Sequence, residues 1–91
     1  MKQLILIADD DAKHRKLLTD VLQAEGYATL TAENGELAIK TARTAKPSLI
    51  LMDIQMPLSD GLSAIRVLKS DRDTRLIPVI AVTAQIGRAH V

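Results

Sequence analysis

The stretch that decides the fold lies in the middle of the chain and reads Leu49-Ile50-Leu51-Met52-Asp53-Ile54-Gln55-Met56-Pro57. Its leading apolar residues predict a short strand buried on both faces, as strands of parallel sheets are. Pro57 cannot continue a central strand, so a turn must follow closely. Asp53 is therefore expected at the carboxyl end of a buried strand, the edge at which open parallel sheets bind ligands. A solvated turn residue is the alternative for a single Asp.

A second stretch of this kind opens the chain. The apolar run from Leu4 to Ala8 predicts another buried strand, and three carboxylates, Asp9-Asp10-Asp11, follow it. Because acidic residues suit a helix N-terminus, Asp11 or Ala12 is expected to begin a helix that stops near Gly26. Its apolar stripe is predicted to consist of Leu17, Leu18, Val21 and Leu22.

Strands and helices alternate through the rest of the sequence. We expect a more exposed strand over 27–32, a helix over 36–45, a helix over 62–70 and a strand over 79–82. The inner faces of the two helices are predicted to be Ala38, Ile39 and Ala42, and Leu62, Ile65 and Leu68. This alternation predicts an α/β fold, a doubly wound parallel sheet built from right-handed crossovers.

The composition limits the possible functions. Ninety-one residues suit one domain with a single core, which must be aliphatic because the chain has one Tyr and no Phe or Trp. A net charge of +1, with scattered Lys and Arg, argues against direct nucleic-acid binding. The absence of Cys excludes disulfides and suits a cytoplasmic protein. The first apolar run is too short to span a membrane.

The carboxylates of two strands are expected to meet at one edge of the sheet. In a doubly wound sheet the first and third strands are neighbours, so Asp9, Asp10 and Asp53 would flank one crevice. Crowded carboxylates favour a hard divalent cation such as Mg²⁺. The ion would also offset the charge of an incoming phosphate, so that an Asp could act as a nucleophile toward a phosphoryl group. Thr83, after the fourth strand, would add a hydroxyl group.

Simpler readings of these residues stay open at this point. Asp9-Asp10-Asp11 would also serve as a helix-capping turn, and Thr83 as a strand-end residue without a ligand. The two histidines, His14 and His90, are expected to be solvated, and Arg15 and Lys16 to lie on an exposed helix face.

Four motifs together closely resemble the response-regulator receiver domain of two-component signalling. They are ILIADDDAKHR at 5–15, LILMDIQMP at 49–57, Asp60-Gly61, and Val82-Thr83-Ala84, and the resemblance runs over residues 2–84. It implies a flavodoxin-like sheet with strand order 2-1-3-4. The implied function is a phosphorylation-dependent switch rather than a turnover enzyme, with histidine kinases, phosphotransfer proteins or small acyl phosphates as donors.

The resemblance also implies a role for each site residue. Asp53 is the implied phosphoacceptor. Asp10 would bind Mg²⁺ directly and Asp9 through water, with the backbone carbonyl of Gln55 as a further ligand. Thr83 resembles the switch hydroxyl that turns toward the phosphoryl group, and Ala84 the small residue beside it.

The family pattern continues beyond what this sequence contains. It includes a fourth helix, a fifth strand with an aromatic switch residue and a terminal Lys, and a fifth helix. We therefore expect residues 1–84 to be a partial receiver domain with impaired phosphorylation, whose exposed fourth strand invites non-specific association and poor folding. Residues 86–91 match one reading frame of a common sequencing adapter, so we expect 85–91 to be a non-native tail. An ordinary short basic tail is the alternative.

Two other functions compete with this interpretation. A phosphatase of the haloacid dehalogenase type also uses an Asp nucleophile with Mg²⁺, and carries a second Asp two residues later, the spacing of Asp9 and Asp11. A binding module that works without phosphate would use the sheet only as a scaffold.

Overall fold

The computed structural model describes residues 2–54 and 61–82. Within these ranges strands and helices alternate in the order β1 (Leu4–Ala8), α1 (Ala12–Ala24), β2 (Ala28–Ala32), α2 (Gly35–Ala45), β3 (Leu49–Asp53), α3 (Gly61–Ser70) and β4 (Val79–Val82). Every described element was predicted, with small differences at the ends. The predicted site residues Gln55, Thr83 and Ala84, and the predicted tail 85–91, lie outside the described residues.

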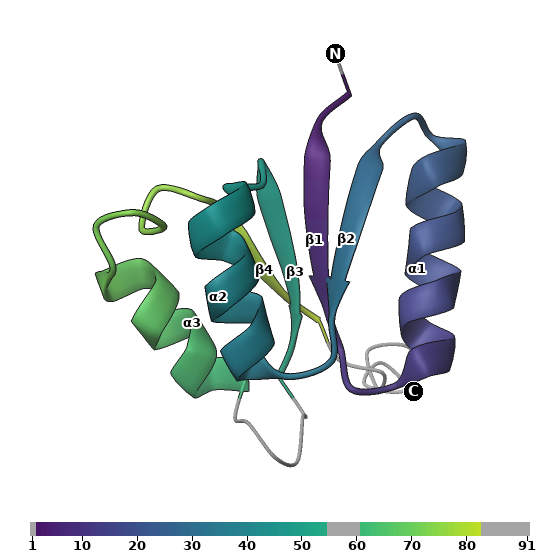
Figure 1. Ribbon diagram of the computed structural model, residues 1–91. Coiled ribbons are helices and arrows are strands. Elements are labelled where there is room, and N and C mark those ends of the chain that lie inside the picture. The colour runs from purple at the N-terminus through teal and green to yellow at the C-terminus, as the bar shows by residue number, and fades with distance from the viewer. Residues whose placement is uncertain (1, 55–60, 83–91) are drawn as a thin grey trace, which may run out of the picture.

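The strands form one parallel sheet in the order β2-β1-β3-β4. Helices α2 and α3 cover one face and α1 covers the other, which confirms the predicted doubly wound α/β fold (Figure 1). The register between β1 and β3 pairs Ala8 with Met52. Asp9 and Asp53, one position further along each strand, therefore stand opposite each other at the carboxyl edge of the sheet.

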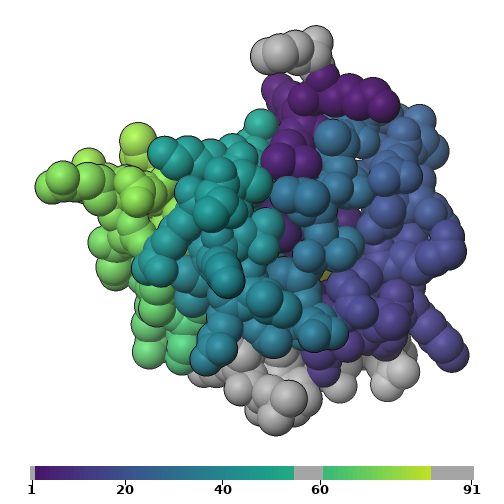
Figure 2. Space-filling view, viewed as in Figure 1, coloured from purple at the N-terminus to yellow at the C-terminus, as the bar shows by residue number. Residues whose placement is uncertain are grey.

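The core lies between the sheet and the layer formed by α2 and α3. It is aliphatic as predicted, and its buried members are Leu6, Ala8, Ala32, Ala38, Ala42, Ile50, Met52, Ala64 and Leu68. Figure 2 shows the atoms of α2 and α3 next to each other on this face of the molecule. On β1 the buried Ile5 and Ile7 alternate with the core residues and so face α1.

Two predicted apolar faces are more exposed than expected. Leu17 and Val21 on α1 are 61% and 51% exposed, and α1 has no buried residue, because no other described helix packs on its outer side. On α3 the inner positions belong to Gly61, Ala64 and Leu68, so Leu62 is exposed. None of the described helices is long and apolar enough to cross a membrane.

The helix ends follow local sequence signals. Asp11 caps α1 by accepting a hydrogen bond from the Lys13 amide at 2.8 Å, and Asn34 caps α2 in the same way. Gly26 ends α1 with a φ of 94°. Its amide donates to the Gln23 carbonyl while the next amide donates to that of Leu22, the pattern of a glycine-terminated helix.

The charged segment between α3 and β4 has a buried anchor. Thr74 is fully buried, and its hydroxyl donates to the Leu68 carbonyl at 2.7 Å. The Lys69 ammonium donates to the Ile77 carbonyl at 2.8 Å. These two bonds fix the path of the chain from the end of α3 into β4.

Candidate functional site

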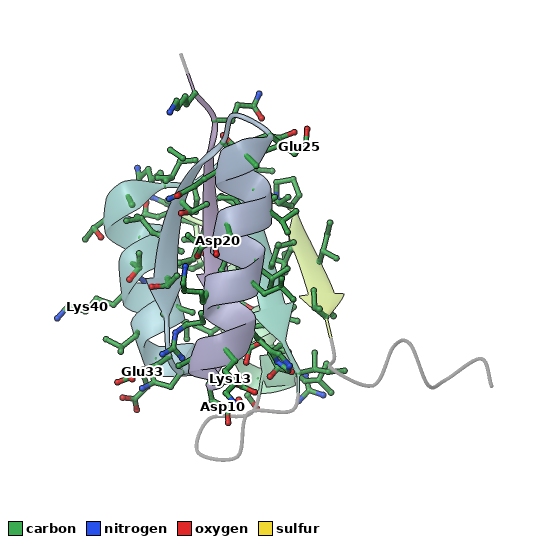
Figure 3. The ribbon with its side chains drawn as sticks, turned by 90° about the vertical axis from the view of Figure 1, so that its right-hand side faces the viewer. Asp10, Lys13, Asp20, Glu25, Glu33 and Lys40 are labelled. Carbon is green, nitrogen blue, oxygen red and sulfur yellow. The ribbon has the colours of Figure 1, made fainter. Side chains whose placement is uncertain are left out.

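The three carboxylates predicted to meet are brought together at the carboxyl edge of the sheet. Asp9 and Asp10 directly follow β1, and Asp53 is the last residue of β3. One carboxylate oxygen from each lies within 4.8 Å of the others. Asp9 and Asp53 are only 4% and 7% exposed, whereas Asp10 is open to solvent. Figure 3 shows Asp10 at this end of the molecule, near Lys13 in the first turn of α1.

The environment of the cluster shifts the pKa of Asp9. Burial is the main cause that raises the pKa of Asp9 above its ordinary value of 3.8, and the charge of Asp53 raises it further. The Asp11 amide and the nearby His14 partly offset this rise. Burial and the neighbouring carboxylate of Asp53 thus both disfavour the charged form of Asp9 and raise its pKa.

Asp9 is held through both its backbone and its side chain. Its amide donates to the Ala32 carbonyl at 3.0 Å and so extends the pairing of β1 with β2. Its Oδ1 accepts from the Asp11 amide at 2.9 Å, and its Oδ2 lies 3.4 Å from His14 Nδ1. Both side-chain oxygens therefore have a neighbour within the protein.

Asp10 and Asp11 differ from Asp9 and from each other. The Asp10 side chain has no hydrogen bond or ion pair with any described residue. Asp11 is occupied in capping α1, and the hydrogen bond from the Lys13 amide is the main cause that lowers the pKa of Asp11. Asp11 is thus turned to the helix, which removes the second carboxylate that a phosphatase of the haloacid dehalogenase type would need there.

Two residues of α1 lie closer to the site than the sequence indicated. His14, expected to be solvated, contacts Asp9, and its Nε2 is 3.7 Å from Asp11 Oδ2. Arg15, expected on an exposed face, is half-buried and donates from Nη1 to the Asp9 carbonyl at 2.7 Å. A signal was present, because side chains in the first turns of a helix lean toward its N-terminus. Lys16, by contrast, is exposed as predicted and pairs with Asp20.

The donor set of this edge fits Mg²⁺. The described residues of the edge offer three carboxylates, of which Asp10 is exposed and without a partner among the described residues, and Mg²⁺ typically takes one or two carboxylates while keeping several waters. A cation there would offset the repulsion between the Asp9 and Asp53 charges, which adds to the effect of burial in raising the pKa of Asp9.

Comparison with known families decides what kind of domain carries this edge. The sequence profile of the response regulator receiver domain matches residues 5–91. This chain belongs to that family. Receiver domains are phosphorylation-dependent switches of two-component signalling, and the resemblance found in the four motifs is thereby confirmed.

Individual relatives agree with this assignment. The receiver domain is 45% identical over 84 residues to the polar-differentiation response regulator DivK of Brucella anthropi, covering 92% of this chain and 68% of the relative. A response regulator TrrA of Thermotoga maritima, solved with Mg²⁺ and BeF, is 36% identical with a TM-score of 0.85, covering 99% of this chain and 76% of that one. The receiver domain of the sensor histidine kinase PA1611 of Pseudomonas aeruginosa, with a coordinated magnesium ion, is 29% identical with a TM-score of 0.86, covering 98% and 75%.

One glycine of the receiver domain is required by a close backbone approach at this edge. Gly61, the first residue of α3, is buried against the end of β3. A Cβ at Gly61 would lie 2.2 Å from the Asp53 carbonyl oxygen and 2.7 Å from the Ile54 Cα. The start of α3 therefore touches the backbone of Asp53, and only glycine leaves room for it.

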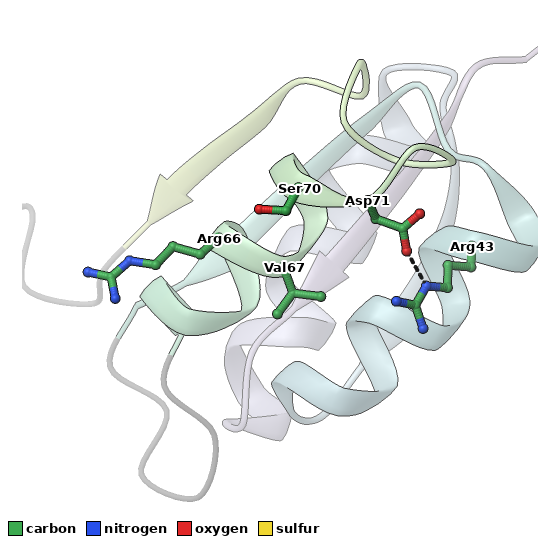
Figure 4. Close-up of a pocket in the computed structure, with 5 residues that line it drawn as sticks. All are labelled: Arg43, Arg66, Val67, Ser70 and Asp71. Carbon is green, nitrogen blue, oxygen red and sulfur yellow. Dashed lines mark hydrogen bonds and ion pairs between the residues drawn. The ribbon is translucent and has the colours of Figure 1, made fainter.

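A separate cleft of about 380 Å³ lies between α2 and α3, lined by Arg43, Arg66, Val67, Ser70 and Asp71. Figure 4 shows the Arg43 guanidinium joined to Asp71 across this cleft, with Arg66 extending away from the pair. The Asp73 amide is the main cause that lowers the pKa of Asp71, followed by Arg43. The pair ties α2 to the end of α3 and is a structural link, remote from the carboxylates.

Proposed function

We propose that this receiver domain is switched by transfer of a phosphoryl group to Asp53, with Mg²⁺ held beside it. The observation that carries the proposal is the convergence of Asp53 with Asp9 and Asp10. In the transfer, a carboxylate oxygen of Asp53 bonds to phosphorus while the bond from phosphorus to the donor breaks, and an acyl phosphate remains on Asp53. A bound Mg²⁺ would supply the positive charge that offsets the carboxylates and the phosphoryl oxygens.

The two residues of the acidic pair would have different roles. Asp10 is proposed to bind the ion directly, since its carboxylate is exposed and has no partner among the described residues. Asp9 is proposed to act through water, because both of its side-chain oxygens already have neighbours. The Gln55 carbonyl would be a further ligand, and Thr83 and Ala84 would contact the phosphoryl group; these three roles rest on the family motifs alone.

The proposed donors are histidine kinases, histidine phosphotransfer proteins and small acyl phosphates. The proposal makes the chain a cytoplasmic switch without turnover of small phosphomonoesters, and it assigns no contact with nucleic acid or membrane. Its support is the family itself, including a relative whose name is that of a response regulator.

Phosphorylation with acetyl phosphate and Mg²⁺ tests this proposal. We expect an acid-stable, base-labile adduct of low or short-lived occupancy, in keeping with the impaired phosphorylation expected from the sequence, and Mg²⁺-dependent NMR shifts with beryllium fluoride as a stable phosphoryl analogue. Asp53→Asn should abolish both signals, whereas the matched control Asp20→Asn, an exposed carboxylate on α1 paired with Lys16, should keep them. A label that persists in Asp53→Asn would refute the assignment.

Magnesium binding gives a second test that needs no phosphoryl donor. Asp10→Ala should weaken Mg²⁺ binding more than Asp11→Ala, because Asp11 is occupied in capping α1. Equal effects of the two substitutions, measured by titration calorimetry, would count against the ligand assignment.

A further inference from the structure

The hydrogen bond from Arg15 to Asp9 reaches from α1 back to the end of β1. The guanidinium Nη1 donates to the Asp9 backbone carbonyl at 2.7 Å, a short bond of the charge-assisted kind. None of the motif roles given above assigns a function to Arg15.

The Asp9 carbonyl and the Asp10 amide belong to one planar peptide group. Because the peptide bond is planar, the direction of the Asp9 carbonyl fixes the Asp10 amide and the position of the Asp10 Cα. On the other side of Asp10, the Asp11 carbonyl accepts from the Arg15 amide at 3.0 Å, the first hydrogen bond of α1. Arg15 thus contacts the backbone on both sides of Asp10: its side chain binds the Asp9 carbonyl, and its amide binds the Asp11 carbonyl.

Among the described residues, the Asp10 side chain is oriented only through its backbone, to which the Asp9 side chain also contributes by accepting from the Asp11 amide. The Asp10 side chain is exposed and without a partner among the described residues, so its direction depends on where the backbone places its Cα. We propose that Arg15 is a positioning residue for the magnesium site, which aims the Asp10 carboxylate at Asp9 and Asp53 by fixing the peptide that joins Asp9 to Asp10. This inference rests on the proposed magnesium site.

The sign of the expected effect separates positioning from simple electrostatics. Removal of a positive charge near a cation site should strengthen cation binding if charge alone mattered. Removal of a positioning contact should weaken it, and loss of an outer contact to a metal ligand typically costs on the order of 10-fold in affinity. The two accounts therefore predict opposite directions for Arg15→Met.

Titration of the full 91-residue chain with Mg²⁺ tests the inference. We expect Arg15→Met to bind Mg²⁺ about 10-fold more weakly than wild type and Arg15→Lys, which keeps a charged donor, to recover most of the loss. Lys16→Met removes the same charge one residue along, where the side chain is exposed and pairs only with Asp20, and should bind Mg²⁺ as tightly as wild type or slightly more so. The Asp10 amide resonance should move in Arg15→Met without Mg²⁺.

Thermal unfolding of each variant without Mg²⁺ distinguishes a merely structural role. If Arg15→Met melts at a lower temperature but binds Mg²⁺ as tightly as Lys16→Met, Arg15 is a structural tie and the inference is wrong. If Asp10→Ala leaves Mg²⁺ binding unchanged, the proposed magnesium site fails instead. Should Arg15→Met not fold, Arg15→Ala, which also lacks a donor, must show the same loss of affinity, and normal Mg²⁺ binding by it overturns the inference.

Discussion

Replacement of Gly61 by Ala would test the packing of α3 against the end of β3. Helix propensity alone favours Ala over Gly by about 1 kcal/mol, so the substitution would stabilise the domain if space were available. The structure indicates the opposite, because the new Cβ would lie 2.2 Å from the Asp53 carbonyl oxygen, well inside the 3.4 Å at which ordinary contact begins. The obstacle is backbone, so relief requires α3 and the strand end to separate by about 1 Å, a form of overpacking.

The expected loss follows from these opposing effects. Overpacking costs about 1–3 kcal/mol and occasionally more, and we take the upper end because the obstacle is backbone, so that after the propensity gain of about 1 kcal/mol the net loss is about 2 kcal/mol. For a domain of this size, that loss lowers the melting temperature by roughly 8–16 °C. Circular dichroism would measure the melt, and NMR shifts at Asp53 and Ile54 would show the displacement. Gly26→Ala is the control, because open space surrounds Gly26 and only its positive φ opposes Ala. A Gly61→Ala variant as stable as wild type would refute the close approach.

Three further predictions follow from single residues. Asp9→Asn should stabilise the Mg²⁺-free domain at neutral pH. Because the pKa of Asp9 is raised in the folded state, the wild type loses stability relative to the variant as pH rises from about 4. Urea midpoints of the two proteins that run parallel across pH would contradict this. Lys46→Gly should raise the free energy of unfolding by about 1 kcal/mol, because Lys46 has a φ of 47°, which glycine adopts without strain. Lys40→Gly, within α2, should lower it by a similar amount, and urea denaturation measures both. Thr74→Val should lower the free energy of unfolding by about 1–2 kcal/mol, because the Leu68 carbonyl loses its hydrogen-bond donor. Thr44→Val, at an exposed position, should change it little, and equal melting temperatures of the two variants would show that Thr74 is not an anchor.

The elements and their order were predictable because apolar runs and turn residues signal them locally. The run before Asp53 could only be a buried strand, and the doubly wound arrangement then required β1 and β3 to be neighbours. That step placed Asp9 opposite Asp53, which the register confirms. The cluster of carboxylates therefore followed from topology, without knowledge of any side-chain position.

The contacts made by α1 were harder to foresee, because they depend on how far a helix stands from its sheet. Arg15 and Lys16 are neighbours with similar chemistry, yet one reaches the Asp9 carbonyl and the other pairs with Asp20 in solvent. Leu17 and Val21 fit an apolar stripe but remain exposed, since their burial depends on a neighbour that periodicity cannot supply. Gly61 has no side chain to signal its role at all.

The two elements that flank Asp9-Asp10-Asp11 differ greatly in burial. The strand before this segment is almost completely enclosed, whereas the helix after it has no buried residue and so should open locally at a small fraction of the global unfolding free energy. Among the described residues, Asp10 thus lies between a well-buried strand and a sparsely buried helix. Any ligand that immobilises Asp10 would restrain the opening of α1, and amide hydrogen exchange along that helix would report occupancy of the site from a distance.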